Sequence, residues 1–214
     1  MPQYAGSNLK CVRSERVVFS NLGFKVEDGD ALVLIGPNGS GKSSLLRLLA
    51  GLLLPAEGTL TWDGEAMVDD MDAHHARMHY VGHLDAVKPV LTVSENISFW
   101  SRMRGHGKDT SENAVGDALD TFAISRLADV PGRFLSAGQK RRVTLARLKA
   151  SPAALWLLDE PTTALDKDAI AALENLIRDH RASGGMVVVS THAEIKLENA
   201  TVLDLSRFSQ RRAA

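Results

Sequence analysis

The sequence has little cysteine, few aromatic residues, almost no net charge and no long hydrophobic run. A single cysteine, Cys11, excludes a disulfide within the chain and favours a reducing compartment. The apolar run over residues 45–54 is among the longest, and it falls short of the roughly 20 residues that span a bilayer. A formal net charge of −1 gives no electrostatic basis for binding nucleic acid. We therefore expect no direct membrane insertion and no nucleic-acid partner.

The beginning of the chain also lacks the pattern of a secretion signal. Residues 1–6 have neither the basic region nor the apolar region that such a signal requires. We expect a soluble cytoplasmic protein that reaches a membrane only through a partner.

The segments that are present predict an α/β fold. Residues 31–35 are apolar at every position, which is typical of a strand buried on both faces. The apolar spacing of residues 43–51 suits a helix that ends at a glycine. Further strands are expected over 155–158 and 186–190, with a helix over 167–182 between them. This alternation predicts one domain with a mostly parallel sheet.

The rest of the N-terminal third predicts short strands, such as residues 58–62, which turn at Asp63-Gly64. The middle of the chain is helical and more polar, and Thr92-Val93-Ser94-Glu95 has the form of a capping box that opens a helix through Arg102. Helices are also expected over 111–122 and 136–150. We predict a core of about residues 1–83 and 136–206, an inserted helical subdomain of about 84–135 and a tail of 207–214.

Positive charges gather on the predicted helix over 136–150. Nucleic-acid binding is one interpretation of this run, but an exposed helix face is the favoured one, since the net charge of the chain is near zero. The residues concerned are Lys140, Arg141, Arg142, Arg147 and Lys149.

Residues 36–43 fit the phosphate-loop pattern G-x-x-x-x-G-K-[ST], and a predicted strand precedes them while a helix follows. The glycines let successive backbone N–H groups converge on one anion, and the helix directs its positive end at the same point. Lys42 adds a charge for the β- and γ-phosphates, and the Ser43 hydroxyl is placed to bind Mg²⁺. The alternative is a glycine-rich turn without function. The predicted ATP-binding residues here are Gly36, Pro37, Asn38, Gly39, Ser40, Gly41, Lys42, Ser43 and Ser44.

Two acidic residues follow the predicted strand over 155–158. Asp159 can hold Mg²⁺ together with Ser43, as the matching aspartate does in other phosphate-loop enzymes. Glu160 comes next, where a carboxylate can polarise the attacking water. An acidic pair is a weak signal alone, and the phosphate loop strengthens it.

With Leu135-Ser136-Ala137-Gly138-Gln139 in the same chain, the sequence resembles the nucleotide-binding subunits of ABC transporters over nearly its whole length. The resemblance implies that these five residues, here called the signature, bind the γ-phosphate of ATP held by a second copy. Ala137 stands where glycine is commoner, and a methyl group should be tolerated there. By the same resemblance Ala164, Leu165 and Asp166 form a dimer-contact loop, and His192 is a switch histidine that acts with Glu160 in catalysis.

Two positions depart from the family pattern. A glutamine usually reports the γ-phosphate and Mg²⁺ to the helical subdomain, and here that position falls on His83, whose imidazole is shorter and can donate or accept a hydrogen bond. An aromatic residue usually stacks on adenine, and the count falls on Arg13, whose planar guanidinium can stack instead. The alternative for Arg13 is a solvated surface arginine.

The departures, with the extension of the signature through Leu148, resemble one branch of the family: the ATP-binding subunits of the haem exporters of bacterial cytochrome c maturation. The resemblance implies a peripheral subunit on the cytoplasmic side of the inner membrane, docked to integral membrane subunits of that system. Hydrolysis of ATP with Mg²⁺ would drive haem export or release of a haem chaperone. Two alternatives are an ABC ATPase for another exported substrate and one that acts on nucleic acid or ribosomes.

Overall fold

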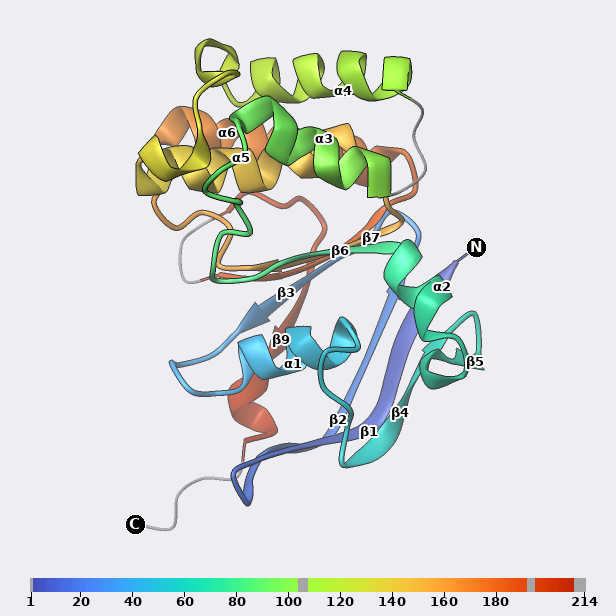
Figure 1. Cartoon of the computed structure of the whole chain (residues 1–214). Helices are drawn as coiled ribbons and strands as arrows, with labels where there is room; N and C mark the ends of the chain where they lie inside the picture. Colours follow the sequence, from blue (N-terminus) through green and yellow to red (C-terminus); the bar gives the residue numbers. More distant parts are fainter. Residues whose placement is uncertain (1, 104–107, 192–194, 210–214) are drawn as a thin grey trace.

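The structure of the chain, a computed structural model, describes residues 2–103, 108–191 and 195–209. Its main sheet has five parallel strands in the order β6-β7-β8-β3-β9 (Figure 1). The predicted α/β fold with a mostly parallel sheet is confirmed. The strands are β3 (Ala31–Ile35), β6 (Met78–Val81), β7 (Leu155–Asp159), β8 (Met186–Ser190) and β9 (Thr201–Asp204).

A second sheet of four antiparallel strands is built entirely from the N-terminal third of the chain. Its strands, in the order β2-β1-β4-β5, are β1 (Gln3–Arg13), β2 (Arg16–Glu27), β4 (Glu57–Trp62) and β5 (Glu65–Ala66). The expectation of short strands was wrong for β1 and β2, which are 11 and 12 residues long. Three shifts of register between these two strands interrupt the alternation of apolar and polar residues, so the sequence pattern breaks where the strand continues.

Two layers of helices and strands cover the parallel sheet. On one face lie α3 (Val93–Met103), α4 (Lys108–Thr121), α5 (Ala137–Ala150) and α6 (Lys167–Ala182). On the other face α1 (Lys42–Leu49) packs between the parallel sheet and the antiparallel one (Figure 1). Alternate residues of each central strand point to opposite faces: Leu155 and Leu157 belong to the core around α1, and Trp156 and Leu158 to the core beneath the helices.

The start of α3 and both ends of α6 lie where the sequence predicts, whereas α4 begins three residues before the predicted 111 and α1 ends at Leu49, two residues before the predicted Gly51. Thr92 and Glu95 form the expected capping box, with the Thr92 N–H donating to the Glu95 carboxylate at 2.8 Å and the Glu95 N–H donating to the Thr92 hydroxyl at 3.2 Å. Helix α6 has the predicted bounds. The division into a core and a helical subdomain stays a prediction, and α5 packs with α3 and α4 in one helical layer. The short helices are η1 (Met67–Asp69), α2 (Met71–Ala76), η2 (Ser125–Leu127), η3 (Gly132–Phe134) and η4 (Leu205–Arg207).

Within the described residues, every helix is too short or too polar to cross a bilayer.

A histidine and a tryptophan stack where α6 meets β7. The His180 ring lies parallel to the Trp156 ring, with 3.7 Å between the centroids. The ring also lies against the backbone at Gly185, where a Cβ atom would come within 2.0 Å of it. Burial disfavours the charged imidazolium and lowers the pKa of His180 to about 4, although a hydrogen bond to the Met186 carbonyl opposes this.

We predict that His180 makes the fold sensitive to mild acid. An unfolded histidine has a pKa near 6.5, above the folded value, so the unfolded state binds more protons as the pH falls. Stability is therefore full above about pH 6.5 and is lost down to about pH 4, by roughly 1–3 kcal/mol. Urea unfolding at several pH values should show a smaller loss in His180→Phe. Lys149→Ala, at an exposed lysine that stays protonated over this pH range, is the control and should keep the original pH dependence.

Candidate functional site

The phosphate loop joins β3 to α1 and curls around the lysine side chain. The Lys42 ammonium donates hydrogen bonds to the carbonyls of Gly36, at 2.7 Å, and Pro37, at 3.3 Å. Gly41, the residue before α1, has a left-handed backbone with φ of 101°, and a Cβ atom there would lie 2.7 Å from the Val18 side chain. Only glycine meets both conditions without strain, which fixes the loop at the first turn of α1.

The carboxyl ends of three parallel strands meet beside this loop. Strand β8 lies between β3 and β7, and Ser190 pairs with Leu34 on one side and Asp159 on the other. Asp159 is 2% exposed, and its Oδ1 accepts hydrogen bonds from the hydroxyls of Ser190 at 2.7 Å and Ser43 at 3.1 Å. A buried carboxylate needs such donors, because burying a charge without partners is costly. The hydroxyl and the carboxylate are oxygen ligands of the kind that Mg²⁺ prefers.

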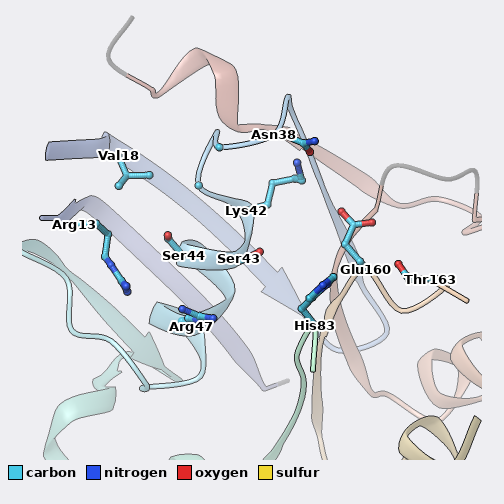
Figure 2. A pocket seen from close by; sticks show the side chains of 12 residues that line it. Arg13, Val18, Asn38, Lys42, Ser43, Ser44, Arg47, His83, Glu160 and Thr163 are labelled. Carbon is cyan, nitrogen blue, oxygen red and sulfur yellow. The ribbon is translucent and has the colours of Figure 1, made fainter. Parts of the chain in front are cut away.

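A pocket of about 660 Å³ opens over the loop, a volume typical of small-molecule sites. Figure 2 shows Lys42, Ser43 and Ser44 between two groups, with Arg13 and Val18 on one side and His83, Glu160 and Thr163 on the other. Of the predicted loop residues, Gly36, Pro37 and Ser40 lie outside the lining. The lining residues are Arg13, Val18, Asn38, Gly39, Gly41, Lys42, Ser43, Ser44, Arg47, His83, Glu160 and Thr163.

The signature does not line this pocket, although all five of its residues are described. It forms the start of α5, where Ser136 and Gln139 make a capping box: the Ser136 N–H donates to the Gln139 side chain at 2.9 Å, and the Gln139 N–H to the Ser136 hydroxyl at 3.3 Å. Leu135 is buried, while Ser136 and Ala137 are exposed. A Cβ atom at Gly138 would lie 2.8 Å from the Ala164 carbonyl oxygen, so glycine lets α5 approach the loop before α6.

That loop, residues 164–166, also has a constrained backbone. Ala164 has φ of 63°, and Leu165 is half-buried. The Asp166 carboxylate caps α6 by accepting the Ala169 N–H at 2.9 Å and also pairs with Arg142. The Ala169 N–H, then the Arg142 guanidinium, lower the pKa of Asp166. The predicted switch histidine, His192, lies outside the described residues.

Two residues at the site were missed by sequence reasoning. The Ser190 hydroxyl donates to the Asp159 carboxylate and accepts a hydrogen bond from the Glu160 N–H at 3.2 Å. In the sequence, Ser190 is marked only as a hydroxyl residue at the end of an apolar strand. Arg141 and Arg147 were expected on an exposed face, which was wrong, because each is only 3% exposed. Arg141 donates hydrogen bonds to the backbone carbonyls of Asp159 and Glu160. Every residue has such a carbonyl, so the sequence does not indicate which ones a buried arginine contacts.

A glycine-rich loop between a parallel strand and a helix, with its lysine in place and a buried aspartate at the end of a second strand, defines a phosphate-loop nucleotide-binding domain. Comparison with known proteins narrows this class. The sequence profile described as "ABC transporter" matches residues 19–163. The chain therefore belongs to the ABC transporter family and is an ABC-type ATPase domain that binds ATP.

Curated relatives share most of the chain. A protein of Rhodospirillum rubrum is 61% identical over 96% of this chain and 87% of its own length, and one of Paramagnetospirillum magneticum is 58% identical over 96% and 95%. Both are named "Cytochrome c biogenesis ATP-binding export protein CcmA". Among solved structures, a dimeric ATP-binding cassette bound to ADP and Pi has a TM-score of 0.79 at 25% identity, covering 89% of this chain and 88% of that one. These names agree with the resemblance to the haem-exporter branch that the sequence analysis found.

We predict that Ser190→Ala lowers the free energy of unfolding by about 1.5–3 kcal/mol, since it removes a hydrogen bond to the buried Asp159 carboxylate. Urea unfolding at pH 7 measures the change. Ser183→Ala, on an exposed serine whose hydroxyl donates to the His180 carbonyl, is the control with an expected change of about 0.5 kcal/mol. Equal stability of Ser190→Ala and the unmodified chain would show that Asp159 does not depend on this hydroxyl.

Proposed function

We propose that this chain is the ATP-hydrolysing subunit of an exporter in cytochrome c biogenesis, in which ATP hydrolysis drives haem export or release of a haem chaperone. The observation that carries the ATPase part is the pocket, where Lys42, Ser43 and Glu160 face one cavity. The names of the two relatives support the biological part.

In the proposed site, Lys42 and the loop N–H groups bind the β- and γ-phosphates of ATP. Ser43 and Asp159 would hold Mg²⁺, which neutralises charge on the phosphates when bound. Glu160 orients and polarises the attacking water. Positioning and electrostatics supply most of the catalysis, since phosphoryl transfer needs little covalent help from the protein.

The remaining parts of the pocket have proposed roles at its two ends. Arg13 stacks on the adenine base, consistent with its place in the lining on the side away from Glu160. His83 contacts the γ-phosphate side, consistent with its place beside Glu160 (Figure 2). By the resemblance to the family, His192 is proposed to act as the switch histidine.

A second copy completes each site in this proposal. The signature lies outside the pocket of its own chain, Ser136 and Ala137 are exposed, and the N-terminus of a helix such as α5 attracts anions. Two chains would close so that each signature covers the γ-phosphate held by the other, with residues 164–166 at the contact. Loss of the γ-phosphate then lets the pair reopen. The dimeric cassette among similar structures supports this assembly.

A groove between α3 and α4 is the proposed place where membrane subunits dock. It has a volume of about 820 Å³, and Phe99 and Met103 on its lining are 37% and 64% exposed. Contiguous exposed apolar surface marks interaction sites, and an amphipathic helix of an integral subunit is the proposed occupant. The chain would then be peripheral, on the cytoplasmic side of the inner membrane.

We predict that Lys42→Ala weakens ATP binding by about 100-fold or more, since it removes the charge that contacts the phosphates, a loss of roughly 3–5 kcal/mol. Isothermal titration calorimetry measures the affinity. Lys149→Ala, which changes an exposed lysine on α5, is the control and should bind ATP as the unmodified chain does. Undiminished affinity in Lys42→Ala would disprove the phosphate-loop assignment.

Glu160→Gln should keep ATP binding, lower kcat by about 10²–10⁴-fold and accumulate closed dimers, because the carboxylate acts on water rather than on the nucleotide. Size-exclusion chromatography with and without ATP measures the dimer, and Glu65→Gln, on an exposed strand, serves as the control. Monomers alone in the presence of ATP would count against a site completed by a second copy.

The same Glu160→Gln variant tests the biological role in a bacterium whose own copy of the gene is deleted. Haem staining of membrane fractions should show c-type cytochromes restored by the unmodified chain and by Glu65→Gln, and absent with Glu160→Gln. Normal cytochromes in the deletion strain itself would point to another exported substrate. Purification of the chain from solubilised membranes should recover integral subunits that handle haem; recovery of ribosomes would overturn the proposal.

A further inference from the structure

The guanidinium of Arg141 is buried although it carries a charge. The residue is 3% exposed, and it forms an ion pair with the Asp85 carboxylate, which is 3.3 Å away and whose side chain is 23% exposed. Burying such a charge is unfavourable unless hydrogen bonds satisfy its donors. Here all three nitrogens donate, and most of the acceptors are backbone carbonyls.

The first group of acceptors consists of three consecutive backbone carbonyls at and beside Glu160. Nη2 of Arg141 donates to the carbonyl of Asp159 at 2.9 Å and to that of Glu160 at 2.7 Å, so both peptide groups beside the Glu160 Cα are held. Nε donates to the Pro161 carbonyl at 3.1 Å. Glu160 has φ of 49°, a left-handed conformation that is unfavourable for residues with a Cβ atom. These bonds keep that conformation and thereby set the direction of the Glu160 side chain.

The second group of acceptors lies in the loop that carries His83. Nη1 of Arg141 donates to the Gly82 carbonyl at 3.0 Å and to the Asp85 carboxylate at 3.3 Å. One planar guanidinium therefore joins two loops that face the pocket from β6 and β7. Lysine cannot reproduce this arrangement, because its three donors radiate from one nitrogen.

The neighbouring arginines of α5 make different contacts. Arg142 donates to the Phe122 carbonyl and to Asp166, and Arg147 donates to the Tyr80 carbonyl. The hydrogen bonds of Arg141 reach both loops that face the pocket. Arg141 lies two residues after the signature on a continuous helix, so its hydrogen bonds connect the start of α5 to the loops that carry Glu160 and His83.

We propose that Arg141 is a positioning residue that couples the two ATP sites of the dimer. This inference rests on the proposed function, in which the signature touches ATP held by the partner while Glu160 acts on ATP in its own chain. When the signature engages the partner's nucleotide, α5 shifts, and Arg141 moves Glu160 and His83 into their working positions. Each site then hydrolyses ATP only after the other has bound it.

The test is the ATP dependence of hydrolysis by full-length Arg141→Lys. Unmodified chain should show a Hill coefficient approaching about 2, the limit for two sites, and Arg141→Lys should fall to about 1. Its kcat should drop about 10- to 100-fold, as small misplacements of catalytic groups do, while ATP affinity by calorimetry stays within about twofold, since Arg141 does not line the pocket. Lys149→Gln on the same helix is the control and should match the unmodified chain.

Asp85→Asn is a second variant, which keeps the test valid if Arg141→Lys does not fold. It retains an oxygen that can accept a hydrogen bond from Arg141 but removes the negative charge. It should lower the Hill coefficient in the same direction by a smaller amount. A purely structural role would reduce the folded fraction and leave the Hill coefficient of the remaining activity unchanged, and that result in both variants would overturn the coupling. If the unmodified chain neither dimerises with ATP nor shows cooperativity, the proposed function fails as well, so the two failures are distinguishable.

Discussion

The hydrogen bonds of one buried carboxylate constrain the whole site. Asp159 is almost fully enclosed, and its Oδ1 accepts from Ser43 at the start of α1 and from Ser190 at the end of β8. An unpaired carboxylate at this place would be strongly unfavourable, so the helix and both strands must meet there. The phosphate loop lies next to this junction, and Glu160 follows directly in the chain. The contacts that hold α1, β7 and β8 together in the core therefore also place the residues of the site.

The nucleotide pocket and the signature lie at different places in the fold. The antiparallel sheet brings Arg13 and Val18 to one side of the phosphate loop, while β6 and β7 bring His83 and Glu160 to the other. The signature begins α5, which belongs to the helical layer (Figure 1), and its residues do not line the pocket. One chain therefore presents a nucleotide pocket at one place and a helix start suited to anions at another, which is the arrangement expected of a paired ATPase.

Elements governed by local patterns were predictable from the sequence. The buried strands at 31–35 and 186–190 and the helix over 167–182 have the predicted bounds, because continuous apolar runs and helical periodicity act over a few residues. The long strands β1 and β2 were not predictable, since their shifts of register interrupt the pattern. The burial of Arg141 was not predictable either. Residues 143–148 of α5 are all buried, so the helix lacks the apolar and polar faces from which the sequence would show which side is exposed.

The sequence by itself determined the chemistry: a phosphate loop with Lys42, an acidic pair and a signature that together place the chain in its family. Only the tertiary structure decided which residues support that chemistry. Strand order in a sheet does not follow chain order, so β8 enters between β3 and β7 and sets Ser190 against Asp159. Arg141 likewise finds its partners among backbone carbonyls of distant loops. Every residue carries such a carbonyl, and only the packing of the folded chain selects the ones that a buried guanidinium can reach.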